Sequence, residues 1–496
     1  MASPSFPVAS RPNIIQGGMG IGVSSWRLAR RVARRGEIGI VSGTGIDNVV
    51  VRELQDGDPH DRRRRLADYP DSDAAEHLVD QYYRPDGRAD EEPYDLLPMH
   101  RFRPTEASQR LLAAAAYTEV RLATEGHEGL IGLNLLAKLK RYTLPCIYGA
   151  MLAGVDLVSI GAGIPMEEAR QIPALAAGDP AELRLDVDTR QAEDPDDTYV
   201  YRFDPRVVAD PPPTLDRPAF LPIVSSDVLA RILDTKLPEA HVDGYVVERH
   251  TAGGHNAPPR NKNYDENDTP LYDDRDEPDL EAVRTLDKPF FLAGGYGTPR
   301  GLRFARSVGA SGIQVGSLFS LADESGYPPD VTRRLVRGLH RGDIDVRTDG
   351  RASSTGFPFK VLTADGTLVD AAVYERRSRI CDLGYLREPY VDGAGRLMGR
   401  CPAEPVATYE SRGGDPEDAQ GRACLCNALM ANIGLGQRRG SAEEPPLFTG
   451  GDALEALPLG SVEDPQYDAD DVIAYLYGSA WTPERDPDRP RPRPAD

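Results

Sequence analysis

The sequence predicts an α/β fold in which eight parallel strands close into a (β/α)8 TIM barrel, with long loop insertions and an appended C-terminal domain. Three observations support this fold class. Short runs of β-branched and apolar residues alternate with helical stretches over the first two thirds of the chain, as in successive βα units. Eight such runs are present, the number that this closed barrel requires. Several of them lead directly into glycines, as expected where strand ends border a ligand site.

The predicted strands are short. They span residues 13–16, 38–42, 130–135, 157–160, 220–224, 245–248, 290–293 and 312–315. A helix over residues 25–35 follows the first strand, and Ser24 or Ser25 provides its N-cap. Further helices are predicted over residues 107–123 and 299–307.

Three long polar stretches interrupt this pattern, at residues 56–104, 186–216 and 258–281. Loops of this length are functional lids or disordered segments. The third begins directly after His255, so it is placed to close over a ligand; a solvated surface loop is the alternative.

The pattern changes again in the last third of the chain. We therefore divide the sequence into a barrel over residues 1–330, a C-terminal domain over residues 331–482 and a tail over residues 483–496. The tail is rich in Pro, Arg and Asp and is expected to be disordered, because it has too few apolar residues to build a core.

Composition and charge limit the classes of partner. The 496 residues carry a formal net charge of −21 at pH 7, which gives no electrostatic basis for binding nucleic acid or anionic membranes. The basic run at residues 62–65 is flanked by acidic residues and is interpreted as a solvated loop. No apolar stretch approaches the roughly 20 residues that span a bilayer, and the N-terminus lacks the apolar core of a signal peptide. We expect a cytoplasmic protein with reduced thiols and a small-molecule substrate; an oligomer is possible.

One segment combines a buried strand with a possible base. The apolar strand at residues 245–248 is followed by Thr-Ala-Gly-Gly-His at residues 251–255. Glycine allows a ligand to approach the backbone, and His255 has a side chain that titrates near neutral pH, which suits proton abstraction beside a cofactor. A glycine-rich turn with a surface histidine is the alternative.

Glycines at other strand ends predict a phosphate site. Residues 12–20 form a strand that runs into glycines, and two later strands end at Gly294-Gly295 and at Gly316-Ser317. Exposed backbone N–H groups at two successive strand ends can hold a phosphate. Phosphate sites of (β/α)8 barrels lie after strands seven and eight, which matches these positions.

Four of these motifs, in order, resemble the FMN-dependent nitronate monooxygenase family, formerly called 2-nitropropane dioxygenases. They are IQGGM at residues 15–19, AGGH at 252–255, LAGG at 292–295 and IQVGS at 313–317. Ordered motifs at barrel-like spacing are more specific than one glycine-rich loop. The family also contains flavin-dependent enoyl-ACP reductases. The last third of the chain, with TGFPFK at residues 355–360, resembles a longer bacterial subgroup that has a cysteine-containing C-terminal domain.

The resemblance implies that FMN binds at the C-terminal ends of the strands. The implied cofactor-binding residues are Gly18, Met19, Gly20, Asn134, Gly254, Gly294, Gly295, Gln314, Gly316 and Ser317. It also implies that His255 removes the α-proton of a nitroalkane. The sequence departs from the family at residues 256–260, where NAPPR replaces a glycine-containing loop, and at Arg249 and His250, where small residues are commoner. The lysine often found at the end of the fifth strand is not evident at residues 224–226.

These observations leave three functions open. The preferred one is nitronate monooxygenase-like oxidation of a small carbon acid such as a nitroalkane or a nitronate. The second is an NAD(P)H-dependent FMN enoyl reductase of a fatty-acid or polyketide pathway. The third is a noncatalytic FMN-binding partner subunit. FMN is expected rather than FAD, because no GxGxxG turn is present for a dinucleotide.

Four of the five cysteines lie in the last third of the chain, at Cys381, Cys401, Cys424 and Cys426. Such a concentration favours a metal site, either zinc or an iron–sulfur cluster. The spacing of Cys424 and Cys426 is shorter than that of the usual zinc pair. Buried structural thiols are the alternative.

Overall fold

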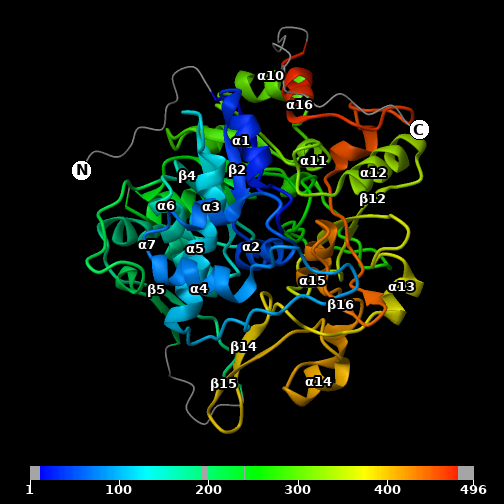
Figure 1. The fold of residues 1–496 in the computed structure, drawn as a ribbon. Coiled ribbons are helices and arrows are strands. Elements are labelled where there is room, and N and C mark those ends of the chain that lie inside the picture. Colours follow the sequence, from blue (N-terminus) through cyan, green and yellow to red (C-terminus); the bar gives the residue numbers. More distant parts are fainter. Residues whose placement is uncertain (1–11, 191–198, 239–240, 479–496) are drawn as a thin grey trace.

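The computed structural model describes residues 12–190, 199–238 and 241–478, which form a mixed α/β structure with two parallel sheets (Figure 1). One sheet has the strand order β1 (Ile14–Gln16), β11 (Gly312–Val315), β10 (Phe290–Ala293), β9 (Tyr245–Glu248), β8 (Ile223–Val224). The other has the order β2 (Gly39–Ser42), β3 (Ile131–Leu136), β4 (Leu157–Gly161), β7 (Ala219–Phe220). Every neighbouring pair in these two sheets is parallel.

The two sheets are linked at both edges. At one edge a parallel bridge joins Ile15 to Ile38, and Gln16 N donates to Ile38 O at 2.9 Å. At the other edge, β7 and β8 are separated by only two residues. Leu221 N donates to β4, whereas Pro222 O accepts from Val246 N of β9. The predicted strand at residues 220–224 is therefore divided into two short strands, and Pro222, which has no N–H, lies at the division.

The strands are buried over nearly their whole length, as expected for parallel strands covered on both faces. One small apolar cluster is drawn from strands of both sheets: Ile15, Ile38, Ile40, Leu157, Ala219, Leu221, Val246, Phe291 and Ala293. A much larger cluster packs other apolar side chains of the strands against the helices.

Helices follow most of the strands. They are α1 (Trp26–Arg34), α2 (Ile46–Gln55), α5 (Glu106–Ala123), α6 (Lys140–Leu152), α7 (Met166–Ala177), α8 (Asp227–Lys236), α9 (Leu280–Arg284), α10 (Pro299–Ser307), α11 (Ser317–Ser320) and α12 (Pro329–Arg341). Side-chain N-caps begin several of them: Ser25 accepts from Leu28 N, and Thr298 accepts from Gly301 N. The predicted helices at residues 25–35, 107–123 and 299–307 are confirmed within a residue at each end.

All three long polar stretches contain regular structure. Residues 56–104 include α3 (Arg62–Leu66) and α4 (Ser72–Tyr82). The second stretch contains β6 (Val200–Phe203), which forms a hairpin with β5 (Ala181–Arg184), and the third contains a 3-10 turn at Asp274–Asp276. The interpretation of residues 62–65 as a solvated loop was wrong. They lie in α3, and Arg62 is buried because it pairs with Glu119 at 2.6 Å and Glu53 at 2.9 Å.

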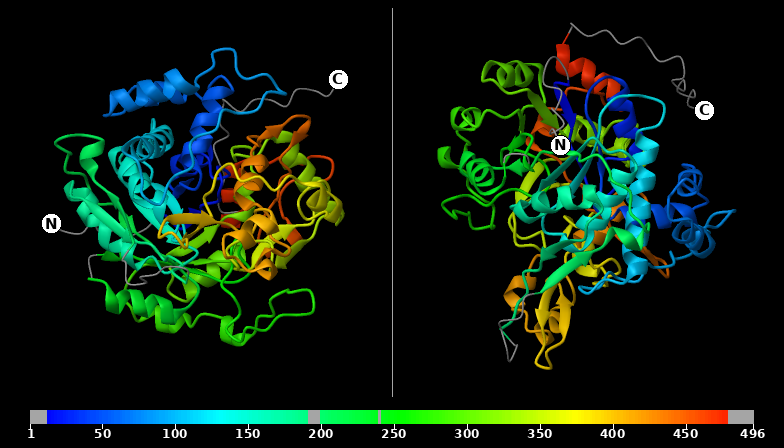
Figure 2. Two further views of the ribbon diagram at one scale, coloured as in Figure 1. Left: turned by 90° about the horizontal axis from the view of Figure 1, so that it is seen from below. Right: turned by 90° about the vertical axis from the view of Figure 1, so that its left-hand side faces the viewer.

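Residues after 345 form hairpins and short helices that gather on one side of the strands (Figure 1 and the left view of Figure 2). The strands are β12 (Val346–Asp349), β13 (Phe359–Leu362), β14 (Glu388–Val391), β15 (Leu397–Arg400), β16 (Arg438–Arg439) and β17 (Ala442–Glu443). The helices are α13 (Ala371–Arg376), α14 (Val406–Ser411), α15 (Leu425–Asn432) and α16 (Ala469–Tyr477), and 3-10 turns are η1 (Pro205–Val207), η3 (Asp274–Asp276), η4 (Pro416–Ala419) and η5 (Asp452–Ala456). The larger apolar cluster extends into this part through Cys426, Phe448 and Ile473.

The tail predicted at residues 483–496 lies outside the described residues. In the part of the chain that is described, no helix has both the length and the apolar character needed to cross a bilayer.

Candidate functional site

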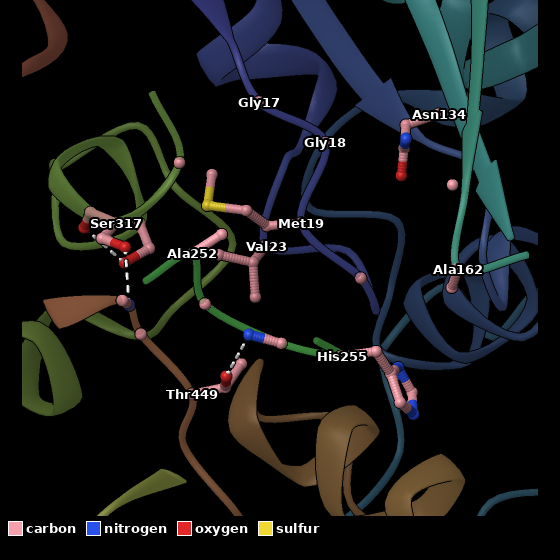
Figure 3. A pocket seen from close by; sticks show the side chains of 18 of the residues that line it. Gly17, Gly18, Met19, Val23, Asn134, Ala162, Ala252, His255, Ser317 and Thr449 are labelled. Carbon is pink, nitrogen blue, oxygen red and sulfur yellow. Dashed lines mark hydrogen bonds between the residues drawn. The ribbon is translucent and has the colours of Figure 1, made fainter. Parts of the chain in front are cut away.

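A cavity of about 210 Å³ opens at the C-terminal ends of the parallel strands (Figure 3). Residues that end or directly follow β1, β3, β4, β9, β10 and β11 form its floor, and segments from the last third of the chain form its far wall. The carboxyl ends of parallel strands are where ligands bind in such folds, so this location marks the candidate site.

Glycines form much of the cavity wall: Gly17, Gly18, Gly20, Gly161, Gly253, Gly254, Gly294, Gly295, Gly297, Gly316, Gly450 and Gly451. At Gly18 a Cβ atom would lie 2.1 Å from the Cβ of Asn134, so only glycine allows these two segments to approach. Gly294 and Gly295 have φ angles of +80° and +79°, which L side chains rarely adopt. The walls therefore expose backbone to the cavity and leave room for a flat ligand.

Each residue predicted to contact a cofactor lines this one cavity. These residues are Gly18, Met19, Gly20, Asn134, Gly254, Gly294, Gly295, Gln314, Gly316 and Ser317, and His255 lines it as well. The loop that contains Met19 is held by Ser24, whose Oγ accepts from Met19 N at 2.8 Å and from Gln16 Nε2 at 2.8 Å. Ser25, not Ser24, therefore provides the N-cap of α1.

The predicted phosphate side of the cavity is joined to residues 449–451. Ser317 Oγ accepts from Gly451 N at 2.8 Å, and Thr449 Oγ1 accepts from Gly254 N at 2.9 Å (Figure 3). Sequence reasoning missed this segment, although its Thr-Gly-Gly sequence resembles the other glycine motifs. Thr251 Oγ1 is also buried beside Gly295, with no hydrogen-bond partner among the described residues. The serine and threonine hydroxyls thus lie together with the backbone of Gly295.

His255 lies on the opposite side of the cavity from Ser317 (Figure 3). Its Nε2 is 2.7 Å from Ser353 Oγ, and its ring meets Phe359 edge-on with centroids 4.9 Å apart. Burial lowers the pKa of His255 to about 3, and the neighbouring charge of Lys138 contributes. The imidazole is therefore neutral at pH 7, and its affinity for a further proton is weak.

Lys138 is a second titratable group beside His255, and sequence reasoning missed it. It follows β3, and its Nζ is buried without a hydrogen-bond partner among the described residues. The Nζ atom lies 3.0 Å from the centroid of the Phe357 ring. Burial lowers the pKa of Lys138 from 10.5 to about 7. A substantial fraction of this amine is therefore neutral at physiological pH.

Glu248, the last residue of β9, contributes a carboxyl group to the cavity wall. Burial raises the pKa of Glu248 to about 7, so the carboxyl is partly protonated at neutral pH and can donate a hydrogen bond. In the sequence it appeared only as the end of a strand. One sequence signal could have identified Glu248: it is a single acidic residue that follows three apolar residues, at the strand end where the site lies.

The wall formed by the last third of the chain is mainly apolar. It consists of Phe359, Tyr385, Leu386, Leu425, Cys426 and Leu429, and Leu136 and Leu139 continue it from the loop after β3. This side of the cavity suits an apolar substrate, because water displaced from it makes few hydrogen bonds.

The four cysteines of the last third surround a separate cavity of about 10 Å³, roughly the space of one water molecule. Burial raises the pKa of each of the four thiols, that of Cys401 to about 12. Nowhere among the described residues are three or more His, Cys, Asp or Glu side chains arranged to hold a metal ion. The expectation of zinc or an iron–sulfur cluster at Cys381, Cys401, Cys424 and Cys426 therefore has no support among the described residues. Burial of the four thiols around a small cavity fits the alternative of structural thiols.

No family model matches the chain. Over 87 residues it is 37% identical to a (3aS,4S,5R,7aS)-5-hydroxy-7a-methyl-1-oxo-octahydro-1H-indene-4-carboxyl-CoA dehydrogenase of Rhodococcus jostii (strain RHA1), covering 17% of this chain and 22% of that protein. The protein of the same name from Mycobacterium tuberculosis (strain ATCC 25618 / H37Rv) is 34% identical over 87 residues, 17% of this chain and 23% of its own length. The chain thus matches less than a quarter of the length of these curated relatives.

Several solved structures share a general likeness with the chain. FabK from Thermotoga maritima has a TM-score of 0.46 at 15% identity, covering 95% of this chain and 92% of its own. Nitroalkane oxidase from Streptomyces ansochromogenes has a TM-score of 0.44 at 14% identity, with coverages of 93% and 94%. The enoyl reductase domain of MlnA from Bacillus amyloliquefaciens has a TM-score of 0.47 at 14% identity, with coverages of 95% and 94%. Similarity at this level does not extend to an activity.

Proposed function

We propose that the chain is an FMN-dependent oxidoreductase whose strands close into a (β/α)8 barrel. The observation that carries this proposal is the single glycine-lined cavity at the strand ends, which brings together all the residues expected to contact FMN. The links between the two sheets at both edges support barrel closure. We also propose a cytoplasmic location and a division into a barrel over residues 1–330 and a C-terminal domain over residues 331–482.

The residues present fit an FMN phosphate and ring. The buried hydroxyl of Thr251, unpartnered among the described residues, lies beside Gly295, and the Ser317 hydroxyl retains its proton for donation because it accepts from Gly451 N. On the floor, Asn134, Glu248 and Gln314 offer polar groups for the edge of the ring. When bound there, FMN supplies an electron acceptor next to the substrate.

The activity we propose is nitronate monooxygenase-like oxidation of a small carbon acid, such as a nitroalkane or a nitronate. The apolar wall of Leu386, Leu425 and Leu429 binds the carbon chain of the substrate and excludes water. Neutral His255, held through Nε2 by Ser353, orients the acidic end of the substrate. No nucleic acid or membrane partner is required for this reaction.

A second candidate substrate is an acyl-CoA thioester. It is favoured by the name of the curated relatives, which are dehydrogenases of a carboxyl-CoA compound. The α-carbon of a thioester is also a carbon acid, so the same wall and the same proton transfer would serve. An NAD(P)H-dependent enoyl reductase differs from both, because it needs a nicotinamide electron donor.

Cofactor analysis and anaerobic reduction test this proposal. We expect mass spectrometry of the released cofactor to find FMN at about one per chain; FAD or no flavin would contradict the proposal. Nitroethane alone should bleach the flavin anaerobically and drive oxygen uptake in air. Bleaching by NADPH with no response to nitroethane would favour the enoyl reductase, and a flavin inert to both would favour a noncatalytic subunit.

A further inference from the structure

A second cavity, of about 240 Å³, lies on the other side of the loop that follows β1. Gly22 and Ser24 of this loop line the second cavity, whereas Ile21 and Val23 line the cavity at the strand ends. Among the described residues, only Tyr327 lines both. The loop therefore separates two cavities of similar size, and the second is not part of the site described above.

Arg27, the second residue of α1, brings a cation to the wall of this cavity. Its Nη2 donates to Ser325 O at 3.0 Å, and it forms no ion pair with a carboxylate in the described part of the chain. The other arginine of the wall, Arg62, is held by both Glu53 and Glu119. An arginine side chain has five N–H donors and stays protonated, so Arg27 offers a charge and N–H groups that the fold leaves unused.

Two further features favour an anion beside Arg27. The cavity lies at the start of α1, where the N–H groups of Trp26 and Arg27 have no intrahelical acceptor. Ser42, which also lines the cavity, is 4% exposed, and its Oγ has no hydrogen-bond partner within the described ranges. The wall therefore combines a guanidinium, the positive end of a helix and a buried hydroxyl.

Two acids in the wall limit the charge of this anion. Burial acts to raise the pKa of Glu53, but Arg62 and His60 outweigh it and lower the pKa to about 2. Burial raises the pKa of Glu119. At least one acid is therefore ionised at neutral pH and would repel a dianion, whereas a single negative charge is balanced by Arg27.

Much of the remaining wall is apolar. It consists of Trp26, Ile46, Val49, Pro328, Pro329 and Ile433. Apolar walls with a few convergent polar groups are typical of small-molecule sites. A ligand that fits this wall has a short hydrocarbon or aromatic body attached to its charged group.

We propose that the second cavity binds a small monocarboxylate with an apolar body, whose carboxylate accepts hydrogen bonds from Arg27 and from the first turn of α1. The planar carboxylate matches the planar donor geometry of a guanidinium. This ligand would also contact Ser24, whose Oγ accepts from Met19 N at 2.8 Å, and would thus lie directly behind the loop of the first cavity. The inference does not depend on the proposed function.

Trp26 provides a direct readout of binding in the holoprotein. The chain has two tryptophans, so Trp481→Phe leaves Trp26 as the only one. We choose benzoate as the probe and expect it to change the Trp26 fluorescence saturably. Benzamide, which has the same shape without the charge, and inorganic phosphate should each bind about 10-fold or more weakly, the scale of a hydrogen bond to a charged group.

Substitutions at Arg27 test the carboxylate contact. Introduced beside Trp481→Phe, Arg27→Gln should weaken benzoate binding by about 10-fold or more, and Arg27→Lys, which keeps the charge, should recover part of it. Arg34→Gln is the matched control, because Arg34 lies exposed on the same helix and does not line the cavity. Circular dichroism verifies that each variant is folded.

Three outcomes would overturn the proposal: unchanged benzoate affinity in folded Arg27→Gln, equal affinity for benzoate and benzamide, or no saturable fluorescence change up to the solubility limit of benzoate. If Arg27→Gln does not fold, the comparison of benzoate with benzamide in the protein that retains Arg27 decides the question.

Discussion

Replacing Lys138 by methionine is expected to stabilise the protein in mildly acidic solution and to lose that effect in alkali. The folded protein buries Nζ without a counter-charge among the described residues, which lowers the pKa of Lys138 from 10.5 to about 7. Between these values the unfolded chain binds a proton that the folded chain does not. The resulting cost to stability is full below pH 7 and disappears as the pH rises towards 10.5.

The size of this effect follows from the two pKa values. A tenfold change in proton affinity corresponds to about 1.4 kcal/mol, so the interval from 10.5 to about 7 gives an upper limit of about 5 kcal/mol. The Phe357 ring stabilises the ammonium in the folded protein, so we expect a measured gain on the order of 2 kcal/mol at pH 6. Methionine fills nearly the same volume as the lysine stem, so cavity formation contributes little.

Urea unfolding of the holoprotein, followed by circular dichroism between pH 6 and 10, measures this gain. The quantity of interest is the difference in unfolding midpoint between Lys138→Met and wild type at each pH. Lys140→Met is the matched control for loss of a lysine from the same loop, since its amine donates to Arg184 O and to Asp186. A difference for Lys138→Met that is constant over this range would refute the reasoning, because it would mean that the amine is not held neutral by burial.

Two further predictions concern the site. His255→Ala should retain flavin but lose turnover by about 10²-fold, because the substitution removes a neutral ring that orients the substrate. Full activity of this variant in a steady-state assay would support the alternative that His255 is only part of a glycine-rich turn. Gly18→Ala should no longer bind one flavin per chain, as measured by flavin absorbance, because the new Cβ would lie 2.1 Å from the Cβ of Asn134. Gly393→Ala is the control: its Cβ would enter open space, so this variant should bind flavin normally.

The strand pattern of this fold was readable from the sequence because burial on both faces selects runs of β-branched residues. The predicted strands at residues 245–248, 290–293 and 312–315 coincide with β9, β10 and β11. The run at residues 220–224 predicted the position of the strand but not its division at Pro222. Proline has no backbone N–H to pair with a neighbouring strand, and the sequence alone does not show which strands lie on either side.

The site was readable only where glycine motifs mark strand ends. Those motifs predicted the floor of the cavity, but Lys138 carries no motif, and its surroundings depend on Phe357, more than two hundred residues later in the chain. The cysteines were ambiguous for a similar reason. Their concentration in the sequence favoured a metal, but only the packing shows that the thiols surround a small separate cavity and that no three metal-ligating side chains among the described residues are arranged to hold an ion.

The hydrogen bonds from Gly254 to Thr449 and from Gly451 to Ser317 have a consequence for biosynthesis. A ribosome delivers the strands of the two parallel sheets well before it delivers residues 449–451, which close the cavity from the far side. While residues 316–448 are being synthesised, the nascent chain therefore carries an open, half-built pocket, and tight capture of a ligand must wait until the chain is almost finished. An internal deletion of residues 449–451 would leave the strands intact and still yield a protein that loses its ligand on dilution.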